Sequence, residues 1–338
     1  MRALPRLAAV AATALFFTAA AHAADTEDLA LLPKSGDIVV QIDVKALAGT
    51  PLVKGLLEQA KANPDVAQQL TELKTEYGLD PERDVERLTI MFPAKSKSGQ
   101  ALMVINTTAA FEQLLAGAKK NAQTLAEKTH AGVKYHAEGN IGMAQVGKRI
   151  LIGDEALLQE ALTDKGKKGL HQNKQMMGLA SRASKAGGQI WFAAVLPEEV
   201  KAKMAVDDPR AKDISTVQGS LDLKSGLALR LDIGAKKGTA DAMVEEINKQ
   251  LAEAKTQQAG NPMMAAMGLG AVIDGLKASA EGDEVRIKLD LTQAQVDQLK
   301  AMAMMMVGMA SAAQTAPPAM PQGGTVTPPP AQPMQKAK

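Results

Sequence analysis

Three histidines that follow the first two dozen residues are the side chains best suited to acid–base or metal chemistry. His136 precedes Glu138 by two positions, so on a strand both would share one face and the carboxylate could support the imidazole. The simpler interpretation is a surface hairpin that carries both side chains. His130 is isolated, and His171 lies among lysines, which suits neither a metal ion nor a general base. Because the chain also has no Cys, we predict no catalytic, metal-binding or cofactor-binding residues.

A glycine pattern comes close to a phosphate-binding loop. Gly142, Gly147 and Lys148 fit G-x-x-x-x-G-K, but Arg149 stands where the loop needs a Ser or Thr for magnesium. The segment also has the pattern of strand, turn and strand, whereas a phosphate loop leads from a strand into a helix. We interpret it as a hairpin turn. The sequence has no G-x-S-x-G elbow, so neither a nucleotide hydrolase nor a serine hydrolase is predicted.

Adjacent acids occur at three places, and none of them predicts a two-carboxylate hydrolase. Neighbouring residues on a helix point about 100° apart, so they do not converge across a cleft. Glu198 and Glu199 suit the first turn of a helix, where negative charge is favourable. Asp207-Asp208 is typical of a turn, and Glu245-Glu246 of a solvated surface. We predict that the protein is not an enzyme; an enzyme with an undetected site is the second alternative.

Methionine is the one unusual enrichment, and its spacing predicts a helix face. Four methionines recur at i, i+3, i+4 and i+7, namely Met302, Met305, Met306 and Met309. Three interpretations remain open: packing against a sheet in place of Leu, an adaptable apolar binding surface, or thioether ligands for Cu(I). Core packing is the simplest of them. The second interpretation makes this face the candidate apolar binding site.

The elements that must position these residues alternate between helices and antiparallel strands. Apolar residues with period 2 predict strands, and apolar residues with period 3.6 predict helices. The first half is expected to hold a strand, two helices, a hairpin, a helix capped by Thr108, three short strands and a helix capped by Asp154. The corresponding ranges are Ile38–Val44, Pro51–Ala62, Val66–Tyr77, Val85–Phe92, Ala101–Asn106, Val133–Ala137, Ile141–Val146, Arg149–Ile152 and Glu155–Leu162.

The second half is expected to repeat this order. In the strand Leu227–Ile233, Leu and Ile alternate with Ala228, Arg230 and Asp232, which predicts one buried and one wet face. Thr292 with Gln295 is a capping box that opens a last helix, from Gln293 to about Ala310. The remaining ranges are helices at Gln175–Ala183 and Pro197–Met204, a long helix that begins at Thr239, and strands at Gln189–Val195, Thr216–Leu223, Leu276–Ala280 and Val285–Leu291.

The two halves are expected to be a duplication. Residues 133–140 and 276–283 share four identities in eight positions, at the same place in the element order. The alternative is two unrelated segments whose hairpins converged on Glu-Gly turns. The fold class predicted is therefore α+β, with two duplicated halves, each an antiparallel sheet with packed helices.

The two ends of the chain have special compositions. Arg2 and Arg6, an uncharged apolar run and Ala21-His22-Ala23 are the three parts of a signal peptide that is cleaved near Ala23. Residues 312–338 are rich in Pro, Gln and Thr, which predicts a disordered tail. The expected organisation is a signal peptide (1–23), a first half (24–163), a linker with a short helix (164–186), a second half (187–311) and the tail (312–338).

Composition limits the partners to be expected. The whole chain has 39 basic and 37 acidic residues, and removal of residues 1–23 takes away two Arg, so the expected mature chain is neutral. Its aromatic residues are scarce, and it has no second long apolar run. These features predict no nucleic-acid binding and no transmembrane segment after cleavage. The partner itself is unknown, with an envelope protein or an apolar ligand as the candidates.

Short motifs along residues 30–310 resemble a family of uncharacterised exported bacterial proteins, grouped as a domain of unknown function. The resemblance implies an exported α+β fold of unknown function, without catalytic residues to carry over. The motifs are Leu32-Pro33 to Asp37, Asp43-Val44, Gly78-Leu79-Asp80-Pro81, Asp84-Val85, Ile150–Asp154, and Trp191 ahead of Leu196-Pro197.

The sequence thus predicts an exported, non-enzymatic protein with a binding or structural role. We expect it in the periplasm, or secreted. The first alternative is a carrier or chaperone-like module that takes an apolar ligand or partner on the Met-rich C-terminal helix.

Overall fold

The computed structural model describes residues 26–93, 100–122, 124–164, 167–259 and 269–302. Residues 1–299 belong to one compact unit and residues 300–338 to a second one, and the fold described here is that of the first unit. The predicted signal peptide and the predicted tail lie outside the described residues. Within those residues, we find no helix with the length and apolarity that a membrane span requires.

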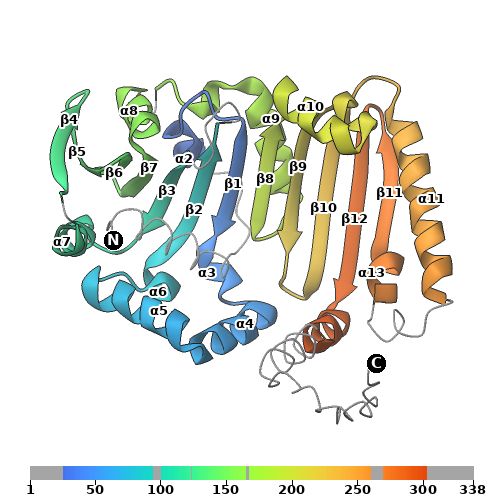
Figure 1. Cartoon of the computed structure of the whole chain (residues 1–338), viewed down its shortest axis with the longest axis horizontal. Helices are drawn as coiled ribbons and strands as arrows, with labels where there is room; N and C mark the ends of the chain where they lie inside the picture. The colour runs from blue at the N-terminus through green and yellow to red at the C-terminus, as the bar shows by residue number, and fades with distance from the viewer. Residues whose placement is uncertain (1–25, 94–99, 123, 165–166, 260–268, 303–338) are drawn as a thin grey trace, which may run out of the picture. The chain divides into compact units, whose positions relative to one another are not determined.

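Twelve strands form one antiparallel sheet, in the order β11-β12-β10-β9-β8-β1-β2-β3-β7-β6-β5-β4 (Figure 1). The first half contributes β1 (Ile38–Asp43), β2 (Val85–Phe92), β3 (Leu102–Thr107), β4 (Ala126–His130), β5 (Val133–Glu138), β6 (Ile141–Val146) and β7 (Arg149–Asp154). The second half contributes β8 (Ile190–Val195), β9 (Ile214–Asp222), β10 (Gly226–Ala235), β11 (Leu276–Glu281) and β12 (Glu284–Thr292). The predicted α+β class is confirmed, and β1 pairs with β8, which joins both halves in one sheet.

The helices connect and cover these strands. In the first half they are α2 (Thr26–Ala30), α3 (Val44–Leu47), α4 (Pro51–Ala62), α5 (Pro64–Glu76), α6 (Pro81–Asp84), α7 (Phe111–Asn121) and α8 (Glu155–Asp164). Later in the chain come η2 (Leu170–Gln172), α9 (Lys174–Lys185), α10 (Glu198–Asp207), η3 (Pro209–Asp213), α11 (Ala240–Ala259) and α13 (Leu269–Gly275). Residues 293–302 are helical as well.

The strand order repeats between the halves, as the predicted duplication requires. The run β1-β2-β3-β7-β6 has the same connections as the run β8-β9-β10-β12-β11. The first half adds the hairpin β4–β5 at its outer edge. The sequence echo, however, aligns β5 with β11, whereas the topology aligns β6 with β11. The echo is therefore shifted by one strand, and the repeated topology is the better evidence for duplication.

Helix termini follow the capping chemistry of the sequence in some places and not in others. Thr292 and Gln295 form the predicted capping box, with Gln295 Oε1 accepting from Thr292 N at 2.8 Å. Asp154 Oδ1 accepts from Ala156 N at 3.1 Å, as predicted. The predicted cap by Thr108 is wrong, because α7 begins later and the Thr108 hydroxyl donates to the Asp84 carbonyl instead.

One face of the sheet, here called the α9 face, is the more deeply buried. It carries Val39, Val104, Leu151 and Trp191, and helices α2, α8 and α9 pack on it. The segment predicted as a linker supplies part of this core, since Leu170 of η2 is fully buried, as are several side chains of α9. Residues 164–186 therefore do more than connect the two halves.

The opposite face, here called the α7 face, carries Val40, Ile90 and Phe192. Over the first half it is covered by α5 and α7, which bury Met103, Ile105, Ile150 and Ile152. The two helices touch closely, because a Cβ on Gly117 of α7 would lie 2.2 Å from the Glu76 carbonyl oxygen. Only glycine permits this approach.

Over the second half the α7 face is covered much less. Helix α11, the counterpart of α7, packs against β11 and β12 at the edge of the sheet. As a result β10 is half-buried along nearly its whole length. The predicted division of β10 into one buried and one wet face is therefore wrong.

Candidate functional site

The three histidines are not brought together. His130 Nε2 lies 2.8 Å from the Thr163 hydroxyl, and His171 is in η2 beside α9. His136 is 5% exposed and packs near Phe111, with 6.5 Å between the ring centroids, so its interpretation as a surface residue is wrong. Burial lowers the pKa of His136, nearby Lys119 lowers it further, and Glu127 partly offsets both.

The structure does not show the support of His136 by Glu138 that the strand spacing allowed as an alternative. His136 Nδ1 has no hydrogen-bond partner among the described residues. The charges that act on the imidazole belong to Lys119, Glu127 and Lys134. In the described part of the chain, no group of three or more His, Asp or Glu residues could hold a metal ion.

A buried carboxylate that the sequence analysis missed organises the first half. Asp28 of α2 is fully buried, and its Oδ2 accepts from Asn106 Nδ2 at 2.7 Å and from the Thr89 hydroxyl at 3.3 Å. Arg149 Nε donates to Asp28 Oδ1 at 2.5 Å, and Arg87 Nη1 lies 3.6 Å from Oδ2. These five residues are called the Asp28 cluster below. These contacts hold α2 against the three strands β2, β3 and β7.

The Asp28 cluster continues across the seam between the halves. Thr89 accepts from Gln41 Nε2 at 3.1 Å, and Gln41 Oε1 accepts from Trp191 Nε1 at 2.8 Å. The chain of hydrogen bonds thus runs from α2 over β2 and β1 to β8. All of its members have structural partners, so none is left to act as an acid, base or nucleophile.

A polar pocket of about 670 Å³ lies beside the Asp28 cluster. Its volume is in the range of small-molecule sites. The wall includes the first residues of α7, the ends of β2 and β3, and the turn between β6 and β7 that carries Lys148. That turn is the near phosphate-loop pattern, and its residues form a hairpin as predicted. Charges of both signs surround the pocket, from Glu27, Glu86, Glu112, Lys148 and Arg149.

This polar pocket lacks the arrangement that catalysis needs. Its hydroxyl groups form hydrogen bonds with the backbone, since Thr107 Oγ1 accepts from Ala109 N and the Thr108 hydroxyl donates to the Asp84 carbonyl. The Asn106 amide is held by Asp28. No histidine is among the residues that line it. A nucleophile next to a general base is therefore missing from its described wall.

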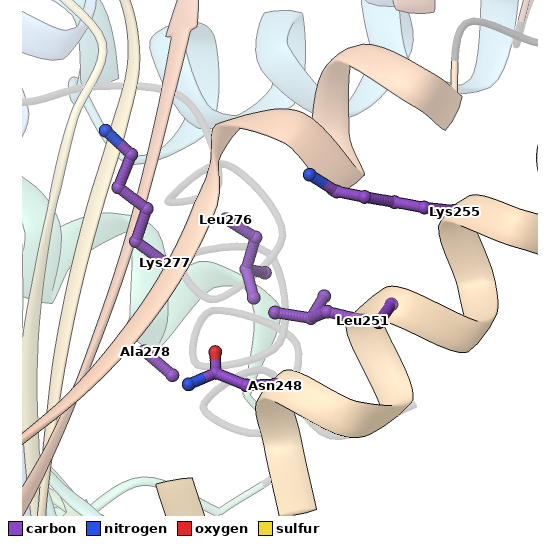
Figure 2. A pocket seen from close by; sticks show the side chains of 7 residues that line it. Asn248, Leu251, Lys255, Leu276, Lys277 and Ala278 are labelled. Carbon is purple, nitrogen blue, oxygen red and sulfur yellow. The ribbon is translucent and has the colours of Figure 1, made fainter. Parts of the chain in front are cut away.

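A smaller groove of about 300 Å³ lies between α11 and the edge strand β11 (Figure 2). Leu251 and Leu276 point toward one another at its centre, whereas Lys277 points away. Lys255 is already paired with Asp274, at 3.0 Å. Its wall combines the two leucines with Asn248, Lys255 and Lys277, so it is only partly apolar.

An apolar strip on the α7 face, here called the central patch, lies outside both pockets. Its members lie on adjacent strands and share one face by register. Phe92 is 37% exposed and the others are half-buried, and none belongs to a core cluster of the described residues. The central patch consists of Ile38, Val40, Phe92, Phe192, Val217, Leu231, Ile233 and Ile287.

Local sequence explains how the central patch lies open. Phe192 has Gly219 as its partner on β9, and a Cβ there would come within 2.8 Å of the Phe192 ring. The ring therefore lies over the glycine. In Figure 1 no labelled helix crosses in front of the middle of β8, β9, β10 and β12, while α9 lies behind β8 and β9.

Only the first residue of the predicted Met-rich face lies among the described residues. Met302 is helical and half-buried, and it belongs to the second unit. Met305, Met306 and Met309 lie outside the described residues. The Met-rich face stays a prediction.

Comparisons with known proteins give a distant likeness of fold. No protein-family model and no curated protein matches this sequence. A solved structure titled "Structure of crystal form I of TP0453" is 8% identical with a TM-score of 0.46, and covers 82% of this chain and 98% of that chain. Crystal form III of TP0453 is 11% identical with a TM-score of 0.47, and covers 81% of this chain and 99% of that chain. The resemblance to exported proteins of unknown function stays a prediction.

Proposed function

We propose that this protein is an exported, non-enzymatic binding protein of the periplasm or cell envelope, and that the central patch is its binding surface. One observation carries the proposal: eight large apolar side chains lie together on one sheet face without a place in any described core cluster. Contiguous apolar surface of this kind marks interaction sites in water-exposed proteins. Export is supported by the three-part signal in residues 1–23.

A binding role is supported over catalysis by where the reactive groups lie. His136 is buried next to Phe111, and His130 and His171 lie on separate elements. The polar pocket has its hydroxyls and amide engaged in structural hydrogen bonds. Substrate chemistry would require groups that these contacts leave free.

Native mass spectrometry of the protein purified from its own envelope tests this function. We expect a retained ligand or partner on the wild type and on Lys288→Glu, whose site lies on the α9 face. The retained mass should be lost from Leu231→Glu on the central patch. Equal retention by both variants would show that the binding surface lies elsewhere. Circular dichroism of each variant checks that it is folded.

A further inference from the structure

Resting on the proposed function, we infer that the occupant of the central patch is a single amphipathic α-helix of a partner protein. The repeat within the fold favours a helix as the occupant. In the first half, the face that corresponds to β9, β10 and β12 is covered by helices α5 and α7, which bury residues such as Met103 and Ile152. The second half presents the same kind of face, and its counterpart helix α11 packs on the outer strands instead.

The dimensions of the central patch also favour a single helix. The central patch crosses six neighbouring strands, from Phe92 on β2 to Ile287 on β12, which is about 24 Å at the usual strand spacing. It holds two residues on β1 and on β10 and one on each of the other four strands, so its depth along the strands is at most two residues, or about 10 Å with side chains. A helix is about 10 Å wide, and about 16 residues of it span 24 Å. One helix therefore matches the central patch in both directions.

The same dimensions argue against a second copy of this chain. A strip of about 24 by 10 Å covers roughly 240 Å², whereas a standard interface buries about 800 Å² on each partner. A dimer would need further contacts around the patch. The central patch also lies in the middle of the sheet, so its strands have both neighbours already, and a partner cannot join them by strand addition.

The direction of the neighbouring helices also favours this occupant. The helices at the two ends of these strands, α4 and α10, run across the strand direction (Figure 1). Leu52 and Val53 of α4 pack with Ile42, Ile190 and Leu227 of the α7 face, so helices that cross the strands fit this surface. A helix along the central patch would run in the same direction.

A fluorescence titration tests the occupant, and the absence of Cys makes labelling specific. Bimane is attached to Leu231→Cys in the central patch, to Ile233→Cys as a second patch site, and to Lys288→Cys on the opposite face. The full mature chain is titrated with a 16-residue amphipathic peptide of Leu and Lys. The comparison probes are a scrambled peptide of equal composition and vesicles of phosphatidylethanolamine and phosphatidylglycerol.

We expect saturable, one-to-one protection of both patch labels by the amphipathic peptide, at least tenfold tighter than by the scrambled peptide, with no change at Lys288→Cys. Equal effects of both peptides, or no effect, would overturn the inference. A response to vesicles alone would point to a lipid surface instead, and protection that grows with protein concentration to a second copy; either outcome overturns it. Failure here leaves the native mass spectrometry result intact, so the two proposals fail separately.

Discussion

Removal of the Asp28 carboxylate should destabilise the protein far more than removal of the neighbouring Glu27 carboxylate. Both acids bind Arg149, but Asp28 is fully buried while the Glu27 side chain is 75% exposed. Breaking a buried ion pair costs about 3–5 kcal/mol, because the remaining charge is left without a partner. The Arg87 and Arg149 side chains are 17% and 18% exposed, so water relieves part of this cost. We expect Asp28→Ala to lose about 3 kcal/mol of unfolding free energy.

The assay is urea unfolding of the mature protein, followed by the fluorescence of its single tryptophan. Trp191 is 3% exposed and is hydrogen-bonded through Gln41 and Thr89 to Asp28, so its emission reports on the same network. The matched control, Glu27→Ala, should lose less than about 1 kcal/mol, as exposed ion pairs do. A loss for Asp28→Ala that is no larger than for Glu27→Ala would refute the argument that the Asp28 cluster anchors α2.

Three further predictions follow from burial, packing and the export signal. Burial lowers the pKa of His136 below its ordinary value of 6.5, so the folded state binds fewer protons than the unfolded state. The stability that neutral His136 contributes is complete above pH 6.5 and falls as the pH drops below that value. The substitution His136→Phe should therefore reduce the difference between the urea unfolding midpoints at pH 7.5 and pH 5.5. An unchanged difference would exclude His136 as the source of the pH dependence. Gly117→Ala should destabilise the protein by about 1–3 kcal/mol, because the new methyl group meets the Glu76 backbone. Gly178→Ala in α9 has open space and should stabilise the protein by up to about 1 kcal/mol. Thermal melts that rank the two variants the other way would contradict the packing of α5 on α7. Amino-terminal sequencing of the protein from the envelope should begin at Ala24, and an intact Met1 would contradict cleavage.

Local pattern was sufficient to predict most strands and several helices. The ranges Val85–Phe92, Ile141–Val146 and Pro51–Ala62 are the same in sequence and structure, since alternating apolar residues or a proline at the first helical turn define them clearly. The strand β4 was missed because Ala126–His130 is exposed at the sheet edge and has no apolar alternation. Its charged residues protect an edge from pairing rather than fill a core.

The functional features depend on contacts that sequence spacing does not encode. Asp28 follows the predicted signal peptide by a few residues, and its partners Arg87, Asn106 and Arg149 come from three strands that are distant in the sequence. A charged residue within an apolar strand pattern, such as Arg87 or Arg149, was the available signal. Likewise the alternation in β10 predicted which residues share a face, and only the placement of α11 decides that this face stays half-buried.

Site-specific photo-crosslinking in intact cells tests the central patch most directly. A benzophenone amino acid replaces Leu231 in the patch or, as the control, Lys288 on the opposite face of the sheet. We predict that irradiation yields a discrete crosslinked product from position 231 and none from position 288. Products of equal yield from both positions, or none from position 231, would contradict the central patch as the binding surface.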